Sequence, residues 1–163
     1  MVFGVSLATY TIIHVIISLI AIAAGFIVVF GMLQGNRMAQ WTAVFLFTTI
    51  LTSLTGFGFP FEHILPSHAV GALSLLFLAV AVYAVYGGRL RGAWRSTYVV
   101  TAVIALWFNV FVLIVQSFQK VGFLKPLAPT QSEPPFLIAQ LAGLGLLAVL
   151  GFLAIRKFRP MTA

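Results

Sequence analysis

Charged residues are scarce in this 163-residue chain: they make up 7% of it, and only two residues, Glu62 and Glu133, are acidic. A soluble domain carries roughly 25% charged residues, so this chain lacks the polar surface that a globule needs in water. Cysteine is absent, which excludes disulfide bonds, thiolate metal sites and cysteine nucleophiles. Aspartate is absent too, which excludes Ser-His-Asp catalysis and a phosphorylated aspartate. These gaps argue against a soluble enzyme, a disordered tail or a nucleic-acid-binding protein.

Apolar residues make up 62% of the chain and are gathered in long runs. A helix needs about 20 such residues to cross the ~30 Å hydrocarbon core of a bilayer. No composition shift or repeat divides the chain. The sequence therefore predicts an all-α, polytopic membrane helix bundle that forms one transmembrane domain over residues 1–163. The five transmembrane helices are expected at about residues 7–33, 41–57, 67–86, 97–118 and 135–155.

The basic residues predict the orientation of this bundle. They lie in short gaps between apolar runs and form no basic block, so nucleic acid is not an expected partner. Seven fall on one side of the bundle: Arg37, Arg89, Arg91, Arg95, Arg156, Lys157 and Arg159. Lys120 and Lys125 fall on the other. The positive-inside rule places the seven in the cytoplasm, with the N-terminus out and the C-terminus in. An aromatic belt at the inner interface would then contain Trp41, Trp94, Tyr86 and Tyr98.

Small and hydroxyl-bearing residues indicate how the helices associate. Small residues lie four positions apart at Ala21 and Gly25 and at Ala139 and Gly143, and Gly145, Ala148 and Gly151 follow. Such spacing lets helix backbones approach closely within one chain, in a homo-oligomer or against partner membrane subunits. The second run carries hydroxyls at Thr48, Thr49, Thr52, Ser53 and Thr55. We interpret them as groups that hydrogen-bond to backbone carbonyls or to neighbouring helices, with a polar path through the membrane as the alternative.

The remaining polar side chains gather toward the outer face. At 1.5 Å per residue, His14 lies roughly 24 Å and His68 roughly 27 Å from the inner ends of their helices. Asn109, Gln116 and Gln140 also fall in the outer half, and Glu62, His63 and Glu133 lie in outer loops. Ionisable groups at membrane depth are costly and suggest a site that faces the bundle interior or a water-filled cavity.

Two histidines of this group, His14 and His68, are candidate axial ligands of a haem b. Imidazole is a common ligand of haem iron. A haem with two histidine ligands needs them on facing helices at nearly the same depth in the membrane, and the expected depths of His14 and His68 agree with this. Apolar residues that could enclose the porphyrin are Phe57, Phe59, Phe61 and Leu65. A histidine hydrogen-bonded to a neighbouring helix, with no prosthetic group, is the competing interpretation of each residue.

A metal ion is the other form that such a site could take. Its ligands would come from Glu62, His63 and His68, although no HExxH or similar spacing supports them. In either form, Asn109, Gln116, Gln140 and Glu133 are the polar side chains expected to support the ligands.

Two stretches carry a resemblance to known proteins. Residues 48–61 (TTILTSLTGFGFPF) and 128–136 (APTQSEPPF) resemble a group of small, uncharacterised bacterial membrane proteins, and the likeness covers most of the chain. It implies a bacterial inner-membrane location and no known activity. The helix number and the two helical histidines also resemble four-helix haem-b membrane cytochromes, which is a likeness of architecture and not of motif.

Three functions remain open on these observations. The first is a membrane protein with an outward-facing His/Glu/Gln ligand site that binds haem b or a metal ion for electron transfer. The second is a non-enzymatic subunit or assembly partner of a larger membrane complex. The third is a channel or carrier for a small solute that uses the hydroxyls of residues 41–57 together with Asn109.

Overall fold

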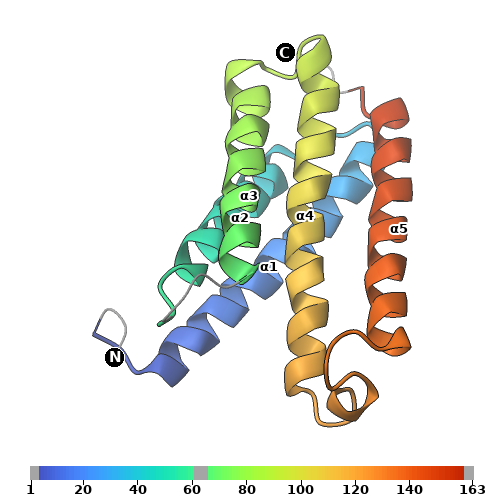
Figure 1. Ribbon diagram of the computed structural model, residues 1–163. Coiled ribbons are helices and arrows are strands. Elements are labelled where there is room, and N and C mark those ends of the chain that lie inside the picture. The colour runs from blue at the N-terminus through green and yellow to red at the C-terminus, as the bar shows by residue number, and fades with distance from the viewer. Residues whose placement is uncertain (1–3, 61–65, 160–163) are drawn as a thin grey trace.

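Five α-helices make up most of the regular structure in the computed structural model, which describes residues 4–60 and 66–159 (Figure 1). They are α1 (Leu7–Leu33), α2 (Ala39–Gly56), α3 (Pro66–Val82), α4 (Ala93–Lys120) and α5 (Pro134–Lys157). A π-helical turn, η1 (Tyr83–Gly87), continues α3, and a 3-10 turn, η2 (Lys125–Leu127), lies between α4 and α5. The described residues contain no strand, which confirms the all-α prediction.

The ends of the helices follow the local chemistry of the chain. The Ser6 side chain caps α1 by accepting a hydrogen bond from the Thr9 backbone N–H, and α5 begins at a proline pair whose missing N–H groups cost nothing there. The predicted range 97–118 was too short, since α4 begins at Ala93 and ends at Lys120. Polar residues at both ends of α4 continue the helix beyond its apolar run.

Four helical segments in the described part of the chain are long and apolar enough to cross a membrane. They are Leu7–Leu33, His68–Gly87, Ala93–Lys120 and Pro134–Lys157. The 18 residues of α2 are not among these four, because polar side chains such as Gln40 and its threonines dilute the apolar run. The structure thus supports a multi-pass membrane protein.

The helices pack around α1 and α4. In Figure 1, α1 crosses the bundle obliquely, and it packs against α2, α4 and α5. Helix α3 packs against α2 and α4, and α4 also packs against α5. No extensive contact joins α1 to α3 in the part of the chain that the structure describes.

Close packing explains some of the small residues and not others. A Cβ atom on Gly25 would lie 2.6 Å from Leu106 Cδ1 and 2.9 Å from Phe45 Cε2, so these two side chains would have to move to admit it. On α5, a Cβ on Gly151 would lie 3.2 Å from Val103 Cγ1 of α4. In contrast, Gly145 faces open space and Ala148 is exposed, so neither serves packing within the chain.

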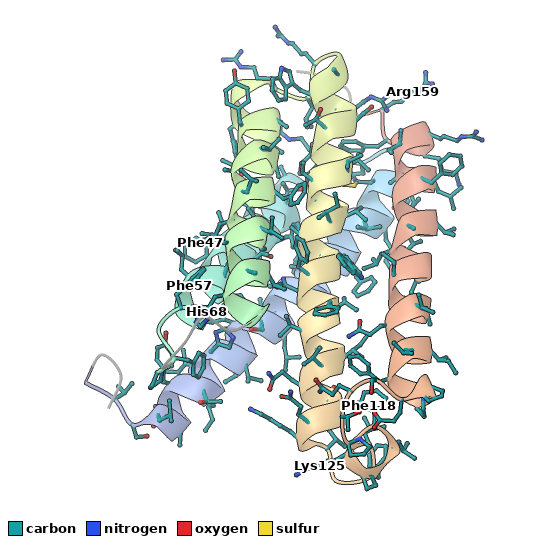
Figure 2. All side chains as sticks on the ribbon, in the orientation of Figure 1. Phe47, Phe57, His68, Phe118, Lys125 and Arg159 are labelled. Carbon is teal, nitrogen blue, oxygen red and sulfur yellow. The ribbon has the colours of Figure 1, made fainter. Side chains whose placement is uncertain are left out.

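The seven basic residues assigned to one side share one end of the bundle, which we call the basic end. The Arg95 guanidinium donates hydrogen bonds to the backbone oxygens of Ile155 and Phe158, which joins the start of α4 to the end of α5. The Thr42 hydroxyl donates to the Arg37 carbonyl oxygen and lies 3.1 Å from the Tyr98 hydroxyl oxygen. Arg159 and Lys125 lie at opposite ends in Figure 2.

The aromatic belt was predicted only in part. Trp41, Trp94 and Tyr86 are exposed near the basic end, as a belt residue must be. Tyr98 is fully buried and its hydroxyl is paired with Thr42, so its place in the belt was wrong. Tyr98 lies on the inward face of α4, a fact that depends on which helices surround it.

Candidate functional site

A cavity of about 590 Å³ lies in the half of the bundle away from the basic end. Its walls are the N-terminal halves of α1 and α3, the last turn of α2 with residues 57–60, and the C-terminal half of α4. Ligand pockets in proteins commonly measure about 300–1,000 Å³ and have largely apolar walls with a few polar groups. This cavity fits that description. Its polar lining includes His14, His68, Ser74, Asn109, Gln116 and Lys120.

His14 of α1 is half-buried and its ring is held by a hydrogen bond to α2. Its Nδ1 atom lies 2.7 Å from Thr55 Oγ1. The single hydroxyl hydrogen of Thr55 is donated to the Leu51 carbonyl oxygen, 2.7 Å away, one turn earlier in α2. Thr55 Oγ1 therefore accepts from His14 Nδ1–H, an assignment that follows from the hydrogen-bond network. This tautomer leaves the lone pair on His14 Nε2 for a ligand.

Aromatic and hydroxyl groups around His14 restrict its ring further. Phe59 meets the ring edge-on, with centroids 5.2 Å apart, and meets Tyr10 in the same way at 5.0 Å. The Tyr10 hydroxyl donates to the Thr55 carbonyl oxygen over 2.7 Å, which ties α1 to the end of α2 a second time. The end of α2 thus sets the direction of the imidazole.

His68 lies near the start of α3 and reaches the cavity from another wall. Its ring stacks on Phe57, with centroids 5.6 Å apart and an interplanar angle of 29°. Figure 2 shows Phe57 and His68 side by side at that end of α3. A Cβ atom on Gly71 would lie 3.2 Å from Phe57 Cε2, so glycine makes room for the phenyl ring. Both imidazoles therefore pack against residues that follow α2, although His14 belongs to α1 and His68 to α3.

The predicted supporting residues divide into two groups. Asn109 is buried and lines the cavity, and its Nδ2 donates to Thr49 Oγ1 over 3.4 Å. Gln116 lies on the same face of α4 and is exposed in the cavity wall.

Gln140 and Glu133 do not line this cavity. The Gln140 amide donates to the Phe111 carbonyl oxygen between α4 and α5, and its Oε1 is buried with no hydrogen-bond partner among the described residues. The Glu133 carboxylate accepts from the Thr130 N–H and hydroxyl and from the Ser132 N–H. Desolvation acts to raise the pKa of this carboxyl, but the hydrogen bonds outweigh it and lower the pKa below the ordinary value.

The predicted metal site falls largely outside the described residues. Glu62 and His63 lie there, as do Phe61 and Leu65, which were named as walls of a haem pocket. Phe57 and Phe59, the other two predicted walls, do line the cavity. Within residues 4–60 and 66–159, no group of three or more His, Cys, Asp or Glu side chains could hold a metal ion.

The hydroxyls of α2 mostly serve packing. Ser53 donates to Ser74 of α3 over 3.1 Å, Thr49 accepts from Asn109, and Thr48 donates to the Val44 carbonyl oxygen of its own helix. The exception is Thr52, whose hydroxyl oxygen is buried in the cavity wall and has no hydrogen-bond partner in the described part of the chain. These contacts support the packing interpretation.

Sequence reasoning missed several cavity residues, above all Lys120 at the end of α4. Asn109, Gln116 and Lys120 are separated by seven and four positions, which places them on one face of a helix. On α1, Thr11, His14 and Ser18 form a matching stripe with spacings of three and four. The helical period of the polar residues was the signal that could have found both walls.

No protein-family model, no curated protein and no solved structure matches this chain. The resemblance to small bacterial membrane proteins and to haem-b cytochromes therefore stays a prediction, and the cavity must be interpreted from its own chemistry.

Proposed function

We propose that this protein crosses the bacterial inner membrane five times, with its N-terminus in the periplasm and its C-terminus in the cytoplasm. Four helices of sufficient length and apolarity support the multi-pass arrangement. Helix α2 has 18 residues, and at 1.5 Å per residue it is about 27 Å long, close to the ~30 Å of the hydrocarbon core. The basic end, with seven of the nine basic residues, favours the cytoplasmic assignment.

We propose further that the cavity binds haem b, with His14 and His68 as axial ligands, and that the protein transfers electrons. The observation that carries this proposal is that both imidazoles line one cavity, where the Nδ1 atom of His14 is hydrogen-bonded to Thr55. A haem with two histidine ligands needs no third protein ligand, so the absence of a group of three metal-binding side chains among the described residues does not count against it.

The chain's own residues would each have a defined part. His14 and His68 would hold the iron, Phe57 and Phe59 would exclude water from one side, and Thr55 would keep the His14 ring in one orientation. A bound haem would supply a one-electron iron couple. Because an electron carrier needs a donor and an acceptor, the proposal includes partner proteins in or at the membrane.

The cavity gives less support to a channel or carrier. Its lining on α1 ends at Ile22, on α3 at Ser74 and on α4 at Phe108, all short of the basic end. The described α2 hydroxyls near it are mostly bonded to protein groups. A transmembrane path would need polar groups through the other half as well.

The absorption spectrum of the detergent-purified protein tests the haem proposal. We expect a Soret band and, after reduction with dithionite, sharp α and β bands typical of six-coordinate haem. His14→Ala and His68→Ala should each lose these features while they elute as folded protein in size-exclusion chromatography. His63→Ala, which removes the third histidine, is the matched control and should keep them. Absence of haem from the wild-type protein, even after titration with haemin, would overturn the proposal, as would an unchanged spectrum in both variants.

A further inference from the structure

Lys120 gives the cavity a positive charge at its edge. It is the only charged side chain in the lining among the described residues, and it lies one turn beyond Gln116 on α4. His14 lies in the α1 wall of the same cavity. The cavity therefore has apolar walls, imidazoles inside and a cation at one side.

No acidic side chain of the described residues neutralises this cation. Glu133 is the only acidic residue that the structure describes, and its carboxylate is bound by Thr130 and Ser132 of its own loop. Gln116 beside Lys120 is exposed and carries two amide N–H donors. Together these two side chains offer N–H donors and one positive charge to a group inside the cavity.

We infer that Lys120 binds a carboxylate of the cavity's ligand, whose apolar body occupies the cavity that α1, α3, α4 and the end of α2 line. If the proposed function holds, this carboxylate is a haem propionate, and the inference rests on that function to this extent. A long-chain fatty acid drawn from the membrane presents the same chemistry, an anionic carboxylate on an apolar body. A charge-assisted hydrogen bond from an ammonium group to a carboxylate is stronger than a neutral one, which gives the site its preference.

A simpler role for Lys120 would be to anchor the end of α4. A cation at a helix C-terminus interacts favourably with the helix dipole, and a lysine there extends its charge to the membrane surface. Such a role does not depend on the charge of a ligand. Comparison of a carboxylate with its neutral ester therefore separates ligand binding from anchoring.

The experiment measures binding of two acid and ester pairs to the full chain in lipid nanodiscs, with empty nanodiscs subtracted. The pairs are haemin with its dimethyl ester and palmitate with methyl palmitate. We expect Lys120→Met to weaken binding of the carboxylate forms about tenfold and to leave binding of the esters unchanged. Lys120→Arg should retain binding of the acids. Lys125→Met is the matched control, because Lys125 is exposed at the same end and does not line the cavity.

The outcomes separate this inference from the haem proposal. Binding of palmitate but not haemin, with the expected loss in Lys120→Met, would overturn the haem proposal and leave the carboxylate site standing. An equal loss of acid and ester binding in Lys120→Met would overturn the carboxylate site. So would an equal loss in Lys125→Met, or wild-type protein that binds neither acid.

Discussion

The imidazole of His14 and the hydroxyl of Thr55 meet at 2.7 Å, although 41 positions separate them in the chain. With the Thr55 hydroxyl hydrogen directed at the Leu51 carbonyl oxygen, Thr55 Oγ1 accepts from His14 Nδ1–H, an assignment made from the hydrogen-bond network. In this assignment one threonine fixes which nitrogen of His14 carries the proton. Hydrogen bonds of this kind orient metal-binding histidines in many proteins.

Replacement of Thr55 by valine should release the His14 ring. Thr55→Val keeps the side-chain volume and removes the acceptor, so the Nδ1–H tautomer loses its support. We expect nitrogen-15 NMR of the imidazole to show a mixture of tautomers, and haemin affinity to fall about 10–100-fold, the usual cost of losing such a partner. Thr55→Ser retains the hydroxyl and should behave as the wild type. An unchanged tautomer in Thr55→Val would contradict the assigned hydrogen bond.

Two glycines should respond in opposite ways to the same substitution. In Gly25→Ala, the new methyl group would overlap Leu106 and Phe45, and overpacking of this kind costs about 1–3 kcal/mol. In Gly145→Ala, no atom lies within 4 Å of the new methyl group, so stability should be unchanged or slightly higher. Thermal unfolding in detergent measures both. Equal melting temperatures for the two variants would show that α1 does not approach α4 as closely as described.

The Glu133 carboxylate should make stability depend on pH at the acidic end of the range. Its folded-state pKa is lower than the ordinary value of 4.5, so its contribution is fully present above that value. As the pH falls below 4.5 and through the folded-state pKa, the carboxylate is protonated and the contribution is lost. Unfolding at a series of pH values should show a smaller loss between neutral and acidic pH in Glu133→Gln than in the wild type. Parallel curves for the two proteins would rule out this role.

Single cysteines can test whether α2 crosses the membrane, because the natural chain contains none. Gln40→Cys lies in the first turn of α2 and Pro60→Cys follows its end, and both positions are exposed. If α2 spans, a membrane-impermeant maleimide added to intact cells should label Pro60→Cys and should reach Gln40→Cys only after permeabilisation. Two variants serve as references for the two sides. Ser132→Cys on the outer side should be labelled in intact cells, and Arg91→Cys on the inner side should be labelled only after permeabilisation. Labelling of Gln40→Cys and Pro60→Cys from the same side would show that α2 does not cross.

The ends of the helices could be predicted to within a few residues, whereas the neighbours that each helix face meets could not. The expected range 7–33 agrees with α1, and the other ranges differ from the structure by a few residues at their ends. Tyr98 illustrates what the sequence did not predict. Its position near the inner end of a helix is typical of a belt residue, yet its side chain is buried. Lys120 illustrates the reverse, since a residue at a helix end was interpreted only as a marker of orientation and proved to line a cavity.

The amino-acid sequence by itself determined that this is a helical protein suited to a membrane, because apolar run length and the scarcity of charge depend only on the order of residues. It also determined which ends carry the basic residues. Only the tertiary structure decided that His14 and His68 share a cavity, that Thr55 orients His14, and that Glu133 and Gln140 lie elsewhere. The physical reason is that helical periodicity specifies which residues share one face of a helix. Which neighbouring helix that face meets depends on how all the helices pack together.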